Sequence, residues 1–327
     1  MKTRKLGATG LELSVIGLGA WAIGGGDWAY GWGPQDDRDS VDAIRRAIDL
    51  GVNWIDTAAA YGLGHSEEIV GKAVKGLRDR VTIATKCGLV WDEKGKIKGF
   101  VSAESVRNEV EASLRRLDVE TIDLYQIHWP TREKNDLDGW AAIQKMIDEG
   151  KIRHAGVSNF SVKQLEAFAT IRPPASLQPP YSMLERGVED ELLPYCAAKQ
   201  IGVVAYSPMQ CGLLTGKMTR ERVDAMPDDD FRRTNHHFTE PALDATLDMV
   251  EGLKDIASSA GKSMAHLAIA WVLRRPEVTS AIVGSRNARQ IEETVGAADW
   301  TLSEKEIDAV EKLIQDRRQR LRNHRGK

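Results

Sequence analysis

The chain has 327 residues, of which 42% are hydrophobic and 28% charged, a composition that excludes disorder and predicts a large buried core. Lys and Arg number 45 against 48 Asp and Glu, and the net charge of -3 offers no field that would attract nucleic acid or an anionic membrane. Cys87, Cys196 and Cys211 are too widely spaced for a zinc site or a disulfide framework, and no segment approaches 18 uncharged apolar residues. We therefore expect a cytoplasmic protein with neither a nucleic-acid nor a membrane partner.

Short apolar runs rich in β-branched residues recur along the chain, each followed by an amphipathic stretch of helix length. The predicted strands span residues 13–18, 52–56, 81–86, 122–128, 154–158, 175–178, 202–206 and 280–283. Helical patterns between them cover residues 40–50, 66–75, 102–117, 137–148, 162–170 and 189–199. Eight alternations of strand and helix favour an α/β fold of the closed (β/α)8 TIM-barrel type over an open sheet. No linker or low-complexity segment interrupts the pattern, so residues 1–327 are predicted to form a single domain.

Three features extend the predicted barrel. Residues 2–6 and 11–14, bridged by the turn at 7–10, predict an N-terminal β-hairpin. Residues 212–241 exceed the length of an ordinary loop, which indicates a lid or binding loop. Residues 303 to about 318 predict an extra C-terminal helix, and the basic residues from Arg317 onward are expected to be its frayed, solvated end.

The segment from Gly17 to Ala22 follows a strand and fits one version of the dinucleotide-binding fingerprint. That motif requires a helix to begin within the glycine turn, so that its amino end can hold the pyrophosphate. Here residues 23–34 contain five glycines and a proline, which do not sustain a helix. We therefore reject a Rossmann-type site at this position.

Polar residues close the second, third and fourth predicted strands, at Asp56, Lys86 and His128. Active sites of such barrels lie where the strands end, and neighbouring strands are only about 4.8 Å apart. An acid, a cation and an imidazole should therefore meet at one mouth, with Tyr61 folding back over them from the loop after Asp56. A phenol titrates near pH 10, and we expect the Lys86 ammonium to lower the pKa of Tyr61 while Asp56 keeps Lys86 protonated.

Aromatic side chains cluster in the loops at or near this mouth, which suggests an apolar, aromatic substrate pocket. Its predicted members are Trp21, Trp28, Tyr30, Trp32, Trp91 and Trp129. The other histidines have no metal-ligand spacing, so no metal is expected, and His236 and His237 are expected to face solvent.

The segment Asp56-Thr57-Ala58-Ala59-Ala60-Tyr61-Gly62, the strand ending in Lys86, and His128-Trp129-Pro130 resemble the aldo-keto reductase superfamily in order and spacing. The hairpin and the long loop are similar in particular to its bacterial stress-response and inositol-utilisation type. The resemblance covers essentially the whole chain. It implies an NADPH-dependent oxidoreductase that reduces aldehydes or ketones to alcohols by hydride transfer, with Tyr61 as proton donor, Asp56 and Lys86 tuning it, and His128 orienting the carbonyl.

The same resemblance implies a binding site for NADP(H). In it, Ser158, Asn159 and Gln178 hold the nicotinamide carboxamide, and Tyr206 stacks on the ring. The remaining implied positions lie at the first two strand ends, in the pyrophosphate segment and in the adenosine-phosphate segment: Gly19, Ala20, Trp21, Asp56, Ser207, Pro208, Met209, Cys211, Gly212, Leu213, Gly216, Lys217, Gly284, Ser285, Arg286, Gln290, Glu293 and Thr294.

Two positions depart from the family pattern: Thr294 stands where Asn is usual beside adenine, and Cys211 lies inside the cofactor loop. Arg286 favours the phosphorylated cofactor, so NADP(H) is expected to be preferred, with NAD(H) as the alternative. The barrel needs no partner to complete it, and a monomer is expected. Two other functions stay open, a nicotinamide-binding regulatory subunit of the same fold and a barrel lyase or isomerase that uses Lys86 as a Schiff-base amine.

Overall fold

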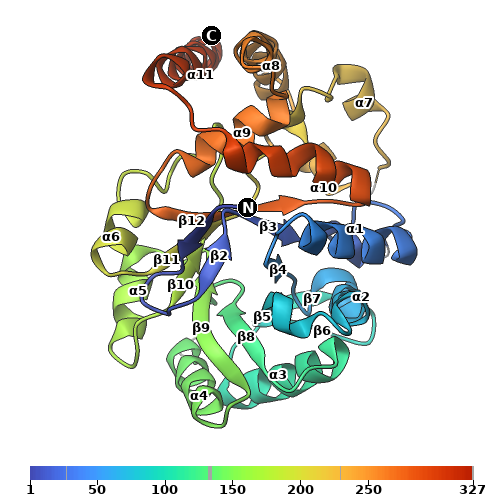
Figure 1. Cartoon of the computed structure of the whole chain (residues 1–327), viewed down its shortest axis with the longest axis vertical. Coiled ribbons are helices and arrows are strands. Elements are labelled where there is room, and N and C mark those ends of the chain that lie inside the picture. Colours follow the sequence, from blue (N-terminus) through green and yellow to red (C-terminus); the bar gives the residue numbers. More distant parts are fainter. Residues whose placement is uncertain (27, 132–134, 229, 326–327) are drawn as a thin grey trace.

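The computed structural model describes residues 1–26, 28–131, 135–228 and 230–325. Its centre is a closed barrel in which each neighbouring pair of strands is parallel and β12 closes the ring against β3 (Figure 1). The barrel strands are β3 (Ile16–Gly19), β4 (Trp54–Asp56), β5 (Thr82–Cys87), β8 (Ile122–Ile127), β9 (Ile152–Ser158), β10 (Ser176–Gln178), β11 (Gly202–Ala205) and β12 (Val278–Gly284). All eight predicted strands are confirmed. The first begins only at Ile16, because Leu13 and Ser14 belong to the preceding hairpin.

A ring of helices surrounds the barrel, and side-chain caps fix several of their starts. The ring consists of α1 (Asp37–Asp49), α2 (His65–Val74), α3 (Ala103–Leu117), α4 (Asp136–Asp148), α5 (Val162–Ala169), α6 (Leu192–Ala198), α9 (Met264–Leu273) and α10 (Ala288–Val295). Ser102 accepts a hydrogen bond from the Ser105 amide at the start of α3, and Ser161 forms a capping box with Gln164 at the start of α5. Both caps lie where the sequence predicts a helix start.

The predicted N-terminal hairpin consists of β1 (Thr3–Lys5) and β2 (Glu12–Ser14). Its fully buried Leu6 and Leu13 pack against the inward-facing side chains of the barrel, namely Trp54, Ala84, Leu124, Val204 and Ile282. The Trp54 ring fills the space next to Gly17, where an added Cβ would lie 2.0 Å from an indole carbon. The hairpin thus plugs the amino end of the barrel, and the carboxyl ends of the strands carry the polar residues.

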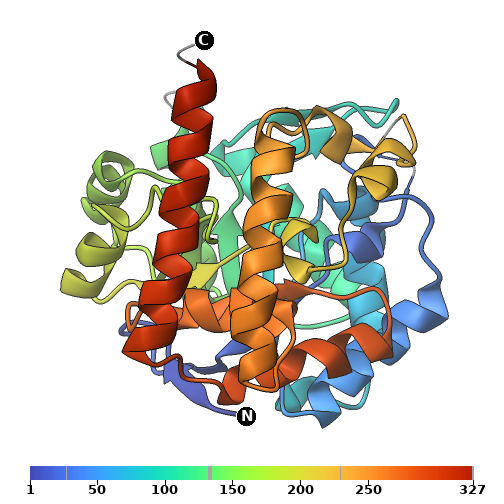
Figure 2. The same cartoon turned by 90° about the horizontal axis from the view of Figure 1, so that it is seen from above.

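Two long helices, α8 (Ala242–Ser259) and α11 (Glu304–Arg325), lie side by side outside the ring (Figure 2). The predicted extra helix is confirmed and extends beyond residue 318. The expectation of a frayed, solvated end from Arg317 onward is wrong in part. The helix continues to Arg325, and Arg317 is only 8% exposed and donates to the Thr246 hydroxyl on α8 at 2.8 Å. Arg318, Arg320 and Arg322 are exposed, as expected. Burial lowers the pKa of Arg317 to about 10.

The long segment after β11 contains short helical turns: η4 (Leu213–Thr215), α7 (Arg220–Asp224) and η5 (Phe231–Thr234). The sequence analysis also leaves unassigned a small hairpin between β5 and α3, made of β6 (Leu89–Trp91) and β7 (Ile97–Gly99). Further short turns are η1 (Ala22–Gly24), η2 (Tyr61–Gly64), η3 (Arg78–Arg80) and η6 (Gly296–Asp299). None of the described helices has the length and apolar character needed to cross a bilayer.

Candidate active site

The four predicted catalytic side chains lie together at the carboxyl ends of adjacent strands. Asp56 ends β4, Lys86 is the penultimate residue of β5, and His128 follows β8. Tyr61 begins the turn η2 and reaches back over them, so that its ring lies 5.6 Å from the His128 ring, edge to face. Asp56 and His128 lie 72 positions apart in the sequence, and they are neighbours in space because parallel strands of a barrel bring their carboxyl ends to one rim.

The Lys86 ammonium is fully buried and uses its three protons on three oxygens. Nζ lies 2.7 Å from Asp56 Oδ2, 2.9 Å from the Thr57 carbonyl oxygen and 3.1 Å from the Tyr61 hydroxyl oxygen. Burial by itself lowers the pKa of Lys86, but Asp56 and Tyr61 outweigh it and the net pKa is raised. The side chain is therefore held as an ammonium. A Schiff-base amine needs an unprotonated nitrogen, so this environment disfavours the lyase or isomerase alternative.

The Tyr61 hydroxyl accepts its hydrogen bond from Lys86, because an ammonium can only donate. Its own proton is therefore available to a group in the mouth of the barrel. Burial raises the pKa of Tyr61, and the smaller opposing effect of Lys86 does not reverse this. The expected net lowering of the phenol pKa is thus wrong, because the loss of solvation on burial outweighs the charge of Lys86. A raised pKa keeps the phenol protonated, as a proton donor requires.

His128 is 9% exposed, and burial together with Lys86 holds the pKa of its imidazole well below the usual 6.5. The ring is neutral at neutral pH, so one nitrogen carries a proton and the other a lone pair. A neutral imidazole next to the phenol can donate one hydrogen bond to a carbonyl oxygen without adding a charge to the buried site.

A continuous set of hydrogen bonds links Asp56 to the predicted nicotinamide residues. Gln178 Nε2 donates to Asp56 Oδ1 at 2.8 Å, and the Gln178 carbonyl oxygen accepts from the Ser158 hydroxyl at 2.8 Å. Asn159 has a positive φ of 66°, donates to the His128 carbonyl oxygen at 3.0 Å and accepts from the Tyr206 hydroxyl at 2.8 Å. The contact between Gln178 and Asp56 is not anticipated by the sequence analysis, since the two residues lie 122 positions apart.

The predicted pyrophosphate and adenosine segments also meet. Positive φ values at Ser207, Gly212 and Gly216 turn the backbone after β11 into a tight loop. Lys217 on this loop pairs with Glu293 on α10 at 2.7 Å, which joins the two segments. The other predicted members of the segments lie on the same loop, at the end of β12 and within α10: Pro208, Met209, Cys211, Leu213, Gly284, Ser285, Gln290 and Thr294.

The first and last strands of the barrel, β3 and β12, meet at glycines on this rim. Gly284 pairs with Gly19, and Gly19 with Asp56, across adjacent strands. A Cβ at Gly284 would meet no atom within 4 Å, so the backbone is open there. Ala20 and Trp21 continue from Gly19 into the turn η1, and α1 begins only at Asp37. Among the described residues between Gly19 and Asp37 no α-helix begins, so this glycine turn is not a Rossmann fingerprint.

Arg286 is held by protein acceptors from the segment before α1. Its guanidinium donates to Gln35 Oε1 at 2.6 Å, to the Trp32 carbonyl oxygen at 3.5 Å and to the Pro34 carbonyl oxygen. Its backbone amide donates to Gln290 Oε1 at 2.9 Å, at the start of α10. Arg286 therefore joins the predicted adenosine segment to the loop that carries the aromatic residues.

Four of the six predicted pocket aromatics form one cluster around Tyr61. Trp21 and Trp28 lie 6.4 and 6.0 Å from its ring, while Trp32 contacts Trp21 and Tyr30 contacts Trp28. In the part of the chain that the structure describes, Trp91 on β6 and the exposed Trp129 have no ring contact with this cluster. The structure thus places the predicted pocket on one side of the mouth, formed by Trp21, Trp28, Tyr30 and Trp32.

Phe231 is a member of the cluster that the sequence analysis missed. Its ring lies 5.1 Å from Trp21 and 6.0 Å from Trp32, so the long loop folds over the mouth. The next residue, Arg232, places its guanidinium 4.9 Å above the Trp32 ring. The length of residues 212–241 predicts a lid over the mouth. It does not indicate which residue of the lid contacts the aromatic cluster.

Two histidines of the same loop differ from expectation. The side chain of His237 is 5% exposed and lies 2.8 Å from Glu185 Oε1, so its predicted exposure to solvent is wrong. His236 is 74% exposed, as expected. The difference arises because the residue after them, Phe238, is buried in a cluster with Leu213 and Leu243 and draws this part of the loop inward.

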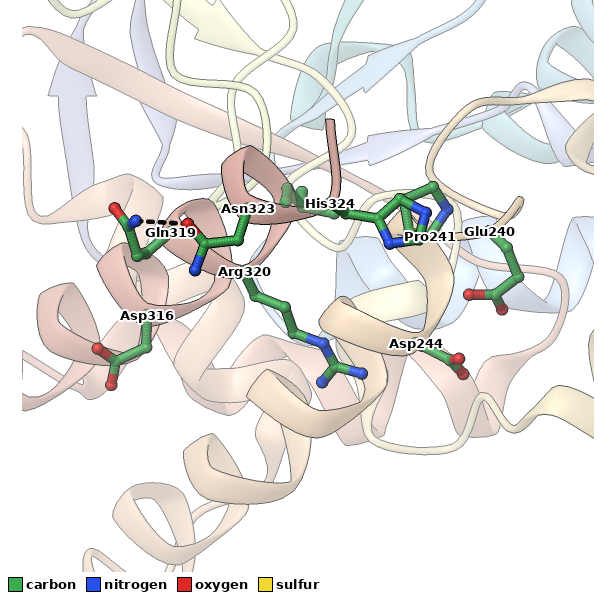
Figure 3. Close-up of a pocket in the computed structure, with 9 residues that line it drawn as sticks. Glu240, Pro241, Asp244, Asp316, Gln319, Arg320, Asn323 and His324 are labelled. Carbon is green, nitrogen blue, oxygen red and sulfur yellow. Dashed lines mark hydrogen bonds between the residues drawn. The ribbon is translucent and has the colours of Figure 1, made fainter. Parts of the chain in front are cut away.

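A groove of about 740 Å³ lies elsewhere, between the start of α8 and the C-terminal half of α11 (Figure 3). Its lining residues are Glu240, Pro241, Asp244, Asp316, Gln319, Arg320, Leu321, Asn323 and His324. None of them belongs to the predicted catalytic or cofactor set. The groove is therefore separate from the site at the strand ends.

Comparison with known proteins places this geometry in context. The chain is 39% identical over 319 residues to the aldo-keto reductase YhdN of Bacillus subtilis (strain 168), covering 97% of this chain and 94% of that protein. It is 35% identical over 329 residues to the NADH-specific methylglyoxal reductase of Escherichia coli (strain K12), covering 96% and 99%. The solved structure of the glycerol dehydrogenase AKR11B4 from Gluconobacter oxydans has a TM-score of 0.87 and 40% identity, over 96% of this chain and 95% of that chain.

The barrel, its polar rim and these matches define an NAD(P)-dependent oxidoreductase that reduces carbonyl compounds. A model of the aldo/keto reductase family matches residues 15–315. The chain belongs to this family.

Proposed function

We propose that the protein reduces aldehydes and ketones to alcohols with Tyr61 as the proton donor. The observation that carries the proposal is the hydrogen bond from Lys86 to the Tyr61 oxygen, which leaves the phenol proton directed to other acceptors. Bound NADPH supplies the hydride that reaches the carbonyl carbon. Ser158, Asn159 and Gln178 would hold its nicotinamide amide, and Tyr206 would lie against the ring.

The negative charge that develops on the carbonyl oxygen is met by two donors. The Tyr61 hydroxyl gives its proton to this oxygen, and the neutral His128 ring donates a hydrogen bond to it. The resulting phenolate is stabilised by the Lys86 ammonium 3.1 Å away, which Asp56 keeps charged. The aromatic cluster excludes water and favours an apolar substituent on the carbonyl carbon.

We further propose that NADP(H) is preferred and NAD(H) also accepted. Support comes from the Arg286 guanidinium beside the start of α10, which can bind a 2′-phosphate once it leaves Gln35 and Pro34. The Escherichia coli relative is NADH-specific by name, so kcat/KM has to be measured with both NADH and NADPH. A larger kcat/KM with NADH than with NADPH would contradict this preference.

The remaining properties belong to the same proposal. We place the chain with the bacterial stress-response and inositol-utilisation type, as a cytoplasmic monomer in which residues 1–327 form one domain. Its hairpin and lid-like loop resemble that type, and the barrel closes on itself without a partner. Size-exclusion chromatography with light scattering tests the monomer directly, and a dimer mass would refute it.

The decisive experiment is the Tyr61→Phe variant, which removes the hydroxyl and keeps the ring. Turnover with a panel of aldehydes, ketones and sugars should fall by about 100-fold or more, while NADPH affinity, measured by fluorescence titration, is retained. Tyr195→Phe on α6 is the matched control and should keep full turnover. Undiminished turnover of Tyr61→Phe would refute the assignment. A wild-type protein that binds NADPH and turns over no carbonyl would instead support the regulatory-subunit alternative.

A further inference from the structure

We propose that Glu185, His236 and His237 form a binding site for a divalent transition-metal cation such as Zn²⁺, at the edge of the long loop. The three side chains offer one carboxylate oxygen and two imidazole nitrogens, all within 4.8 Å of one another. Two histidines and one carboxylate are a frequent zinc ligand set when a fourth position is left open. This site goes beyond the proposed carbonyl reduction and uses none of its residues.

The distances between the three side chains already approach those between ligands of one coordinated ion. His237 Nε2 lies 2.8 Å from Glu185 Oε1, and His236 Nε2 lies 3.6 Å from the same oxygen. A tetrahedral zinc ion with bonds of about 2.0–2.1 Å holds its ligand atoms about 3.3 Å apart. Small side-chain movements therefore suffice to admit the ion between the three atoms.

The backbone holds the three ligands in place before any ion binds. Glu185 lies in a turn whose amides donate to the fully buried Ser182 hydroxyl, and that hydroxyl bonds to Gln210 Oε1. The amide of His237 donates to Asn235 Oδ1 at 2.9 Å, and the buried Phe238 anchors the chain directly after it. Such preorganisation lowers the cost of ordering the ligands when the ion arrives.

Charge and exposure also suit a cation with one open coordination position. The site combines one carboxylate, from Glu185, with two imidazole rings whose centroids lie 3.9 Å apart. His236 is 74% exposed and Glu185 38% exposed, which leaves an approach for the ion and for a water ligand. The facing cation is Arg317 on α11, whose charge acts on both Glu185 and His236 and limits the affinity.

A bound ion would tie the long loop to the segment after β10. Glu185 follows β10, whereas the two histidines lie in the loop whose residue Phe231 contacts Trp21 at the mouth. A hydrogen bond between His237 and Glu185 makes this link in the structure, and a bound ion would replace it with three stronger bonds. The loop should therefore open less readily when Zn²⁺ is bound.

The test is a titration of the tag-free full-length protein with Zn²⁺ alone, followed by calorimetry and by thermal melting. We expect one saturable site and a higher Tm with Zn²⁺. His236→Ala and Glu185→Gln should each weaken binding at least 10-fold and abolish the Tm increase. His65→Ala is the matched control, because His65 also pairs with a carboxylate, Asp37, at 2.8 Å, and it should bind Zn²⁺ as the wild type does.

Both variants are expected to fold, because their side chains are partly or largely exposed, and the melting curve without metal checks this. No saturable binding by the wild type would overturn the proposal and leave the cluster as a hydrogen-bonded latch. Binding that is unchanged in His236→Ala and Glu185→Gln would overturn it as well. The titration contains no cofactor or substrate, so its failure leaves the proposed reductase function standing. Failure of the Tyr61→Phe test likewise leaves the proposed metal site standing.

Discussion

The ion pair of Asp56 and Lys86 should dominate the local energetics of the site, and Asp56→Asn tests this. The pair is 2.7 Å long, and the side chains of Lys86 and Asp56 are 0% and 4% exposed. Removing one partner of such a buried pair costs about 3–5 kcal/mol, because the other charge is left without compensation. Asn keeps the size of Asp but has one carbonyl oxygen in place of two, so it can accept from Lys86 while its NH2 group faces Gln178, whose amide must turn to accept from it. The loss in unfolding free energy therefore reports mainly the charge and not a change in packing.

A double-mutant cycle separates the pair from its surroundings. Lys86→Met leaves the Asp56 carboxylate buried and should cost about the same as Asp56→Asn. In the double variant no buried charge remains, so its cost should be no larger than that of either single variant. Urea unfolding followed by tryptophan fluorescence gives the four free energies. Costs that simply add in the double variant would refute the claim that these two charges depend on each other.

A surface pair of equal length serves as the control for this cycle. Arg107 and Glu149 also lie 2.7 Å apart, but their side chains are 44% and 37% exposed. Water and salt screen this pair, so Glu149→Gln should change the unfolding free energy far less than Asp56→Asn. Equal effects of the two substitutions would show that burial is not the cause.

Three further predictions concern stability and substrate choice. Burial raises the pKa of Glu109 to about 7 from an ordinary 4.5, so the folded state binds this proton more tightly than the unfolded state. The unfolding free energy should therefore fall between pH 5 and pH 7, by at most about 3 kcal/mol for a partly exposed group. Glu109→Gln should flatten this pH dependence in urea unfolding, and an unchanged slope would contradict the assignment. Gly17→Ala should cost about 1–3 kcal/mol because its Cβ would overlap the Trp54 ring, whereas Gly187→Ala meets no atom within 4 Å and serves as control; equal melting temperatures would contradict this. Phe231→Ala should raise KM for aromatic aldehydes about 3- to 10-fold and affect a two-carbon aldehyde less, as steady-state kinetics can show, and an equal change for both would contradict the lid contact.

The sequence predicts the barrel well because its signal is local and repeated. Each strand is a short apolar run, and each helix start carries its own capping residue, as at Ser102 and Ser161. The rule that strand ends meet at one rim then brings Asp56, Lys86 and His128 together without any knowledge of packing. The hairpin β6–β7 escapes this reasoning, because two three-residue strands carry too few residues for a periodic pattern.

What the sequence alone determined is therefore the order of elements, the closed barrel and the residues that gather at its carboxyl rim. Only the tertiary structure decided how strongly each group is desolvated and what it touches across the chain. It reversed the expected shift of the Tyr61 pKa, buried Arg317 against α8, and brought Glu185 to His237 and Phe231 to Trp21. The physical reason is that burial and long-range contact depend on the packing of segments far apart in the chain, and no local pattern of residue types encodes that packing.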